Sequence, residues 1–279
     1  MKVVFVGAGR LATHFAQALR ASGHNIVAVY SRTLSSAKAL SSVVGGFATD
    51  SLSSFPTEAD AFVIAVKDSA LAEVLDLLGQ GREGQLFLHT AGSIALSVFG
   101  QHTPCGVIYP MQTFSKERKV DFSRIPIFIE GDGDHALRVA RQLATSVSSH
   151  VSELSSADRR HLHLAAVFAC NFVNHCYTLS AEILERHGMT FDVMLPLIAE
   201  TAEKVASVHP RDAQTGPAVR YDENVLNAQR QLLADQPTVQ AVYDLMSKSI
   251  HQTSNFLDEP SGTAERKLQI SNFKRDCHD

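Results

Sequence analysis

The sequence lacks the marks of several protein classes. Its 279 residues include no tryptophan and only four scattered cysteines, none of them in a CxxC pair. Four cysteines are too few for a disulfide framework, and the cysteines and histidines do not have the spacing of a metal site. We therefore expect reduced thiols, a cytoplasmic location and no bound metal. No charged leader followed by an apolar segment stands at the amino terminus, so no secretion signal is expected.

Blocks of one charge are also missing. Lys and Arg total 25 against 29 Asp and Glu, which gives a formal net charge of −4 and an isoelectric point near 6.3. Without a basic block to neutralise the phosphates of a duplex, nucleic acid is not an expected partner. A long stretch free of these charged residues, 161–181, carries three histidines and two asparagines. It predicts a buried helix of a soluble protein and no membrane association.

What the first half does contain is an alternation of short β-branched runs with helical segments. This alternation predicts a mainly parallel sheet with crossover helices. The predicted strands cover 3–6, 26–30, 61–66, 86–89, 106–109 and 127–130. A helix is expected to end at Gly23, Asp68 is expected to cap a second helix, and another is expected to begin after Gly133.

After about residue 152 the apolar spacing is helical throughout, which predicts a second, all-helical domain. Ser155 and Asp158 form a capping-box pattern that opens a helix reaching Arg186. Such a helix would exceed ~40 Å, so it either kinks or packs partly on another subunit, and we expect a homodimer. Further helices are predicted over 191–205, 222–233 and 238–255, with a loop over 208–221. The predicted domains are 1–152 and 153–258, followed by a polar tail over 259–279.

The strongest local motif is GAGRLA at residues 7–12, which follows the first strand and opens a helix. Gly7 permits a tight turn, Gly9 lets the backbone approach a pyrophosphate, and Ala12 keeps the helix close to the strand. The amides at the start of the helix, at Arg10 and Leu11, would face the anion. The motif predicts dinucleotide binding, and the alternative is an ordinary tight turn.

Ser31, Arg32 and Thr33 follow the second predicted strand, where an NAD site would present an acidic residue to the ribose. Arg32 can instead pair with a 2′-phosphate, and the two hydroxyls can donate to it, so NADP is favoured over NAD. The alternative is that Arg32 is a solvated surface residue.

Polar residues also follow the strands predicted at 61–66 and 86–89. Val66 and Lys67 stand at the end of the first, and Thr90 and Ser93 follow the second. Ligands of open α/β sheets bind outside the carboxyl ends of the strands, so we expect contact with a cofactor or substrate here. Loops at strand ends are commonly polar, which leaves a structural role open.

With these motifs, residues 1–110 resemble the NADP-binding domain of deazaflavin-dependent NADP reductases and pyrroline-5-carboxylate reductases. The rest resembles a helical domain of unknown function that accompanies this Rossmann type in bacterial proteins classed as NADP oxidoreductases. The segments that carry the resemblance are 89–93 (HTAGS), 110–114 (PMQTF), 163–171 and 215–222 (TGPAVRYD).

The resemblance implies an α/β Rossmann domain with a mainly parallel sheet, followed by an all-α domain similar to that of 6-phosphogluconate dehydrogenase-like enzymes. Proteins of this kind are usually dimers. Two positions depart from the pattern, because Tyr109 stands where the family commonly has His and Leu162 where it has Tyr. No catalytic role is therefore transferred to them.

A hydride-transfer enzyme needs a polar group beside the nicotinamide to protonate or polarise its substrate. His163 is our candidate general acid and Asn171 the candidate for orienting the substrate, with Ser93 as a further polar group. On a regular helix His163, Cys170 and Asn174 would lie within ~20° of one stripe, with Asn171 ~80° away. The alternatives are a hydrogen-bonded core or interface histidine and a buried amide that ties two helices together.

Arg220 lies in the segment 215–222 and could clamp an anionic substrate, while Asp222 orients it or caps the next helix. A structural turn is equally open for this segment.

Taken together, these patterns favour an NADP-dependent oxidoreductase that transfers hydride between NADPH and a small carbonyl or imine compound bound between the domains. Arg220 would make that compound an anionic one. A non-catalytic NADP-binding sensor or scaffold is the alternative, because the second half holds no unmistakable acid, base or catalytic lysine. A different nucleotide in the same crevice is the third hypothesis.

Overall fold

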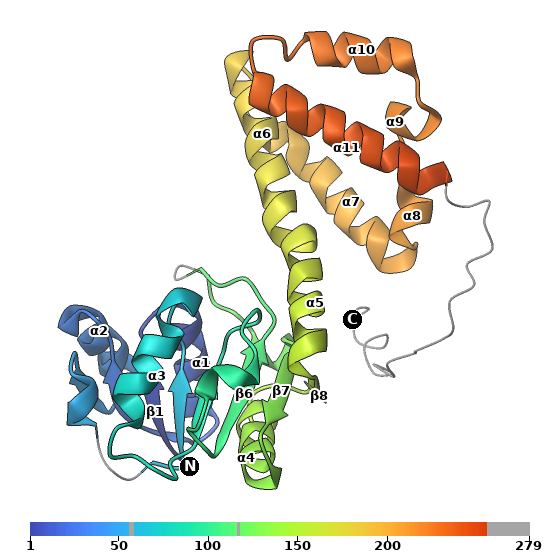
Figure 1. Cartoon of the computed structure of the whole chain (residues 1–279). Coiled ribbons are helices and arrows are strands. Elements are labelled where there is room, and N and C mark those ends of the chain that lie inside the picture. Colours follow the sequence, from blue (N-terminus) through green and yellow to red (C-terminus); the bar gives the residue numbers. More distant parts are fainter. Residues whose placement is uncertain (56–58, 116–117, 256–279) are drawn as a thin grey trace. The chain divides into compact units, whose positions relative to one another are not determined.

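The structure is a computed structural model that describes residues 1–55, 59–115 and 118–255 (Figure 1). Contacts divide the chain into two compact units. Of the described residues, 1–171 form the N-terminal unit and 172–255 form the C-terminal unit.

The N-terminal unit is built on a sheet whose described strands have the order β3-β2-β1-β4-β5-β6-β7-β8. Neighbouring strands are parallel except β6 and β7, which are antiparallel. Their bounds are β1 (Lys2–Val6), β2 (Asn25–Tyr30), β3 (Phe47–Thr49), β4 (Ala61–Ile64), β5 (Phe87–His89), β6 (Cys105–Pro110), β7 (Ile127–Gly131) and β8 (Val151–Glu153). Because β2 and β4 flank β1, the strand order reverses at β1, where ligand crevices of doubly wound sheets open.

Each face of the sheet carries its own apolar core, since alternate residues of a strand point to opposite faces. Val3 and Phe5 belong to the core that contains buried residues of α1, α2 and α4, whereas Val4 and Val6 belong to the core that contains those of α3. The helices are α1 (Arg10–Ala21), α2 (Leu34–Val44), α3 (Leu71–Gly79) and α4 (Asp134–Thr145). Short 3₁₀ turns are η1 (Leu52–Ser54), η2 (Asp68–Ala70), η3 (Leu96–Phe99) and η4 (Phe122–Arg124).

One long helical segment runs from Ser156 to Arg186 in three parts. These are α5 (Ser156–Ala166), the π-helical segment η5 (Val167–Phe172) and α6 (Val173–Arg186). The Ser155 hydroxyl oxygen accepts the amide hydrogen of Asp158 at 3.1 Å and so caps α5. Both predicted ends of the helix are confirmed. The π-helical turn was not predicted.

The C-terminal unit continues with helices alone in its described part. Its elements after α6 are η6 (Phe191–Met194), α7 (Leu195–Ser207), α8 (Pro210–Ala213), α9 (Pro217–Arg220), α10 (Glu223–Gln231) and α11 (Pro237–Asn255). The loop predicted over 208–221 is wrong in part, since it contains α8 and α9. Each of these starts with a proline at its first helical position, where the missing amide hydrogen has no helical partner to lose.

The other local differences have simple causes. The strand predicted over 61–66 ends at Ile64, and β3 and β8, each three residues long, were not predicted. Asp68 does not cap a helix directly, because it lies in η2 and Ala70 occupies the cap position of α3.

The stretch 161–181 is far from buried within the single chain. Leu164, Phe168 and Phe172 are each at least half exposed. The prediction of a buried helix is therefore wrong for the isolated chain. No helix in the described ranges is long and apolar enough to cross a bilayer.

The contact-based division falls between Asn171 and Phe172, inside the long helical segment, rather than at 152–153. The predicted boundary marks the end of the strands, and it stays a prediction. The tail predicted over 259–279 lies outside the described residues.

Candidate functional site

The turn after β1 is shaped for a glycine. Gly7 has a φ of +118°, and its amide donates to the Tyr30 carbonyl oxygen at 2.9 Å. A Cβ at this position would lie 2.3 Å from the Ala65 carbonyl oxygen. The turn thus lies tightly against the ends of β2 and β4, and a side chain there would force the backbone apart.

The start of α1 presents open amides beside this turn. Gly9 holds the N-cap position, no described side chain caps the helix, and its first turn contains no acidic residue. A Cβ on Gly9 would meet no described atom within 4 Å. Arg10 is exposed, Leu11 is half-buried and Ala12 is fully buried against the sheet. An uncapped helix start with free space before it fits a pyrophosphate, so these residues fit NADP.

Ser31, Arg32 and Thr33 directly follow β2, as predicted. The Ser31 amide donates to the Thr49 carbonyl oxygen at 3.1 Å, and the Thr33 hydroxyl donates to Ser36 Oγ at 2.8 Å. Arg32 is exposed and has no ion-pair partner in the described part of the chain. A free guanidinium at this position fits the 2′-phosphate that distinguishes NADP from NAD.

The residues after β4 and β5 lie at the same edge of the sheet. Thr90 is buried and its hydroxyl donates to the Ile64 carbonyl oxygen at 3.3 Å, so it ties the two strand ends together. Val66 is half-buried and Lys67 is exposed. The Ser93 hydroxyl donates to the Asp68 carboxylate. Contact of these residues with a ligand stays a prediction.

A phenol and an imidazole form a pair where β6 ends against α5. Tyr109 Oη lies 3.0 Å from His163 Nδ1, and the two rings meet edge to face with centroids 5.9 Å apart. A Cβ on Gly92 would lie 2.5 Å from His163 Nδ1 and 2.8 Å from Tyr109 Cζ. The pair therefore needs a glycine at position 92.

Burial raises the pKa of the Tyr109 phenol, the charge of Arg159 opposes this rise, and that of Asp68 adds to it. The phenol is thus protonated at neutral pH. With the ring proton of His163 on Nδ1, this nitrogen donates to the Tyr109 oxygen, the phenol keeps its own hydrogen for another acceptor, and Nε2 carries no proton.

This pair lines a cavity of about 390 Å³ in the N-terminal unit. The wall comes from the end of β6, the loop after it, α5 and η5. Its polar residues are Tyr109, Gln112, Thr113, His163 and Asn171, and three alanines, Ala165, Ala166 and Ala169, leave space between them. None of the described lining residues is Asp, Glu, Lys or Arg.

The π-helical turn explains why the predicted stripe does not hold. A π-helix has more residues per turn than an α-helix, so positions after His163 change their angle around the axis. His163, Cys170 and Asn171 line the same cavity, whereas Asn174 lies beyond η5 in the C-terminal unit. Cys170 is a half-buried lining residue rather than the core residue that its type suggests.

Arg220 is exposed at the last position of α9, in the C-terminal unit. Asp222 caps α10, since its carboxylate accepts the Val225 amide hydrogen at 3.4 Å. Capping is thus the observed role of Asp222. The clamp role of Arg220 stays a prediction. No cluster of three or more potential metal ligands occurs among the described residues.

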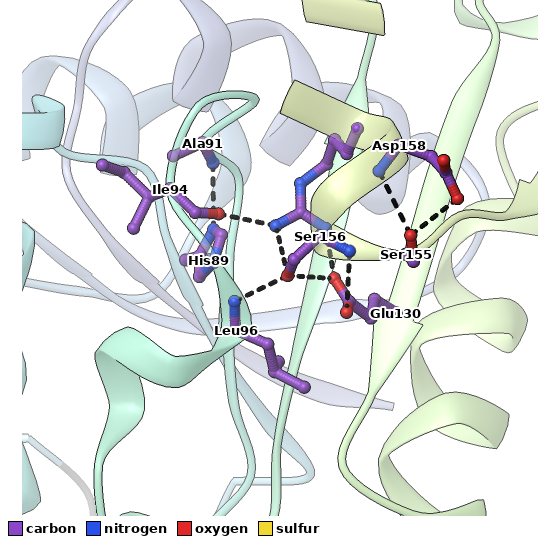
Figure 2. A network of polar contacts seen from close by, with 9 residues as sticks. His89, Ala91, Ile94, Leu96, Glu130, Ser155, Ser156 and Asp158 are labelled. Carbon is purple, nitrogen blue, oxygen red and sulfur yellow. Dashed lines mark hydrogen bonds and ion pairs between the residues drawn. The ribbon is translucent and has the colours of Figure 1, made fainter. Parts of the chain in front are cut away.

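A buried polar network lies beside the pair, and Figure 2 shows Glu130, Ser156, Ile94 and Leu96 within it. Its centre is Arg159, which is 1% exposed and forms an ion pair with Glu130. Arg159 also donates to the Ile94 carbonyl oxygen at 2.6 Å and to Ser156 Oγ at 3.2 Å. These bonds join β7, the start of α5 and the loop after β5.

Sequence reasoning missed Tyr109, Gly92 and Arg159 as parts of the site. Tyr109 was visible only as a departure from a family pattern, and Gly92 only as one letter of the segment 89–93. Arg159 stands in a charged, polar stretch at a helix start, where nothing in the sequence marks it as buried.

Comparison with known families gives one match in each half of the chain. The family model described as NADP oxidoreductase, coenzyme F420-dependent, matches residues 2–91. A model described as a domain of unknown function, DUF2520, matches residues 125–250. No match was found among curated proteins.

Solved structures give the same picture. BF3122 from Bacteroides fragilis, provisionally classed as an NADP oxidoreductase, is 48% identical with a TM-score of 0.86, over 90% of this chain and 98% of that one. Protein TM1727 from Thermotoga maritima is 22% identical with a TM-score of 0.75, over 91% and 99% of the two chains. An imine reductase from Myxococcus stipitatus, solved with NADP⁺, is 17% identical with a TM-score of 0.66, over 92% and 95%.

A doubly wound sheet, an open glycine turn and an exposed arginine after β2 define an NADP-binding Rossmann domain, here joined to a helical domain. The chain belongs to the family of NADP oxidoreductases that combine a domain of the F420-dependent NADP oxidoreductase type with a DUF2520 domain. The predicted family, fold class and cofactor NADP are thereby confirmed. Its general function is NADP-dependent oxidoreduction.

Proposed function

We propose that this protein uses NADPH to reduce a small carbonyl or imine compound bound in the cavity beside Tyr109 and His163. The observation that carries this proposal is the 3.0 Å hydrogen bond between the phenol and the imidazole at the wall of that cavity. A neutral phenol held by an imidazole is a proton donor with a route for its own reprotonation.

The cofactor supplies the hydride when it is bound. In our proposal the open amides at Gly9, Arg10 and Leu11 hold its pyrophosphate, with Gly7 and Ala12 keeping the turn tight. Arg32, with Ser31 and Thr33, holds the 2′-phosphate. Val66, Lys67 and Thr90 lie at the strand ends along which the rest of the cofactor would extend.

Tyr109 gives its proton to the substrate oxygen or nitrogen as the hydride reaches the adjoining carbon. His163 then returns a proton to the phenolate through Nδ1 and recovers one from water through Nε2. The sum is one hydride and one proton added across the double bond. In this scheme His163 is an acid, as its sequence suggested, but it acts through Tyr109.

The lining of the cavity bears on the substrate. Because its described wall carries no charged side chain, we propose that the part of the substrate held here is uncharged. Asn171, Gln112 and Thr113 can donate or accept hydrogen bonds around the reacting group. Binding of an anionic group by Arg220, which lies in the C-terminal unit, stays a separate prediction, as does contact of a ligand with Ser93, whose hydroxyl donates to Asp68. A homodimer and a cytoplasmic location also stay predictions.

A titration followed by a turnover screen tests the proposal. We expect NADPH to bind more tightly than NADH, and NADPH to be oxidised with some members of a panel of small uncharged ketones and cyclic imines. Tyr109→Phe should lower kcat by about 10²–10⁴-fold without changing NADPH affinity, because it removes only the transferable proton.

Tyr243→Phe is the matched control, since its hydroxyl donates to Gln229 at 2.8 Å, within the C-terminal unit. Tight NADPH binding with no oxidation by any panel member would favour the alternative of a sensor or scaffold. Full turnover by Tyr109→Phe would remove the phenol from the mechanism.

A further inference from the structure

Arg159 is a charged side chain in a fully buried position, which is rare in proteins. Its side chain is 1% exposed, and its charge is compensated by the Glu130 carboxylate, which is 19% exposed. Its Nε has no hydrogen-bond partner among the described residues. Burying a charge with one orphaned nitrogen costs free energy that an apolar residue would not cost. A structural explanation alone is therefore incomplete.

The bonds of Arg159 link the loop that contains Gly92 to α5, the helix that carries His163. The Ile94 carbonyl oxygen accepts from Arg159 at 2.6 Å and belongs to the loop after β5, which also contains Gly92. Arg159 itself lies one turn before His163 on α5. The Leu96 amide adds a second tie, because it donates to Ser156 Oγ at 2.8 Å.

Glu130 completes the clamp from β7. It accepts from the Ser156 amide at 2.9 Å and from the Ser156 hydroxyl at 2.7 Å, besides its ion pair with Arg159. The first turn of α5 is thereby fixed to β7 and to the loop after β5 together (Figure 2). The gap at Gly92 is too narrow for any side chain, since a Cβ there would lie 2.5 Å from His163 Nδ1.

The charge of Arg159 acts on the same pair. It opposes the rise that burial gives to the pKa of Tyr109, while Asp68 acts in the opposite direction. The other ionisable groups around the pair are His163, which is bonded to the phenol, Glu130 on β7, and His89 on β5, whose pKa is lowered to about 3 chiefly by burial. His89 is thus neutral at the pH of turnover.

We propose that Arg159 is a positioning residue for the donor pair: its bonds hold the Gly92 loop against α5, and its buried charge stabilises the tyrosinate that Tyr109 becomes on giving up its proton. This inference rests on the proposed function of Tyr109. It adds a residue, Arg159, that both aligns Tyr109 with His163 and stabilises the ionised form of Tyr109.

The test separates charge from structure with three variants. Arg159→Met removes the cation, Glu130→Gln breaks the same ion pair but keeps the cation, and Asp68→Asn removes a carboxylate of opposite effect. The chain has no tryptophan and five tyrosines, so the ultraviolet absorbance of tyrosinate can be followed directly. Each variant is compared with the same variant carrying Tyr109→Phe, so the difference reports Tyr109 alone.

We expect Arg159→Met to raise the pH at which Tyr109 ionises, Asp68→Asn to lower it, and Glu130→Gln not to raise it. Arg159→Met should also lower kcat by up to about 100-fold, with NADPH affinity unchanged, because the pair loses its alignment. Arg159→Lys keeps the charge, so it should retain the Tyr109 titration and recover part of kcat. It also serves if the methionine variant does not fold.

An unchanged Tyr109 titration in Arg159→Met would overturn the proposal. So would an Arg159→Lys variant in which the pH of Tyr109 ionisation rises by as much as Asp68→Asn lowers it. So would equal losses of kcat in Arg159→Met and Glu130→Gln with identical pH profiles. The titration needs no substrate, so it stands apart from the proposed function. If Tyr109→Phe keeps full turnover, the donor role fails even where Arg159 still shifts the titration.

Discussion

At the scale of single residues, the site depends on what is missing from a side chain as much as on what is present. Gly92 lets the Tyr109 hydroxyl and His163 Nδ1 come within 3.0 Å, because no Cβ stands between them. Gly7 does the same for the turn after β1, where a Cβ would lie 2.3 Å from the Ala65 carbonyl oxygen. Neither glycine has a side chain that could react, yet each allows the groups around it to approach closely.

The first prediction concerns Gly92→Ala. The added methyl group should separate Tyr109 from His163, since both lie under 3.0 Å from its position. We expect kcat to fall by about 100-fold while NADPH binds as in the unchanged protein, because the cofactor turn at Gly7 is untouched. Stopped-flow turnover and NADPH fluorescence titration measure the two quantities.

Gly133→Ala is the control, because a Cβ there would meet no described atom within 4 Å and the φ of Gly133 is extended. An unimpaired kcat in Gly92→Ala would show that the pair tolerates displacement. It would then be a structural contact only.

The second prediction concerns His89, which is fully buried and stacked on Phe99 with ring centroids 5.4 Å apart. Its Nδ1 accepts the Ala91 amide hydrogen at 3.1 Å. Burial lowers its pKa from 6.5 to about 3, so the unfolded chain binds a proton more readily than the folded one over this range. The free energy of unfolding should therefore fall as the pH drops from about 6.5 towards 3, and should not change through His89 above that range.

Urea unfolding at a series of pH values measures this slope, and His89→Gln should reduce it. A smaller slope will remain, because burial also lowers the pKa of His24. The prediction fails if the pH dependence is the same with and without His89.

At the scale of elements, regular patterns were predictable and short or irregular ones were not. The alternation of strands and helices and the capping box at Ser155 gave the sheet and both ends of the long helix, because periodicity and caps are local signals. The π-helical turn at Val167–Phe172 carries no such signal, since its sequence, VFACNF, contains no glycine, proline or charged residue that would mark a change of helix type. It is the element that brings Asn171 to the cavity, so the predicted angles of the candidate residues failed there.

The site followed the same rule. The glycine turn and the residues 31–33 were recognisable, because phosphate binding uses backbone geometry that the sequence states directly. The pairing of Tyr109 with His163 joins residues 54 positions apart, and the Arg159–Glu130 pair joins residues 29 apart. Contacts of that range depend on how β6, β7 and α5 pack, which no local pattern reveals.

At the scale of the whole molecule, the C-terminal unit leaves much apolar surface uncovered. Leu197 on α7 is 63% exposed and Leu245 on α11 is 69% exposed, whereas few apolar residues of the described part of this unit are buried. Monomeric proteins rarely expose so many large apolar side chains over one small unit. Because homo-oligomers are the commonest soluble assemblies, a second copy of the chain is the partner we expect to cover this surface.

The last prediction follows from this surface. Sedimentation velocity at micromolar concentration should give a species of twice the 30.3 kDa chain mass. Leu197→Glu and Leu245→Glu should weaken the dimer, because each would place a charge in an apolar contact. Leu77→Glu is the matched control, since Leu77 is 49% exposed on α3 in the N-terminal unit. A single 30.3 kDa species in the unchanged protein would contradict the dimer, and the exposed leucines would then need a different partner.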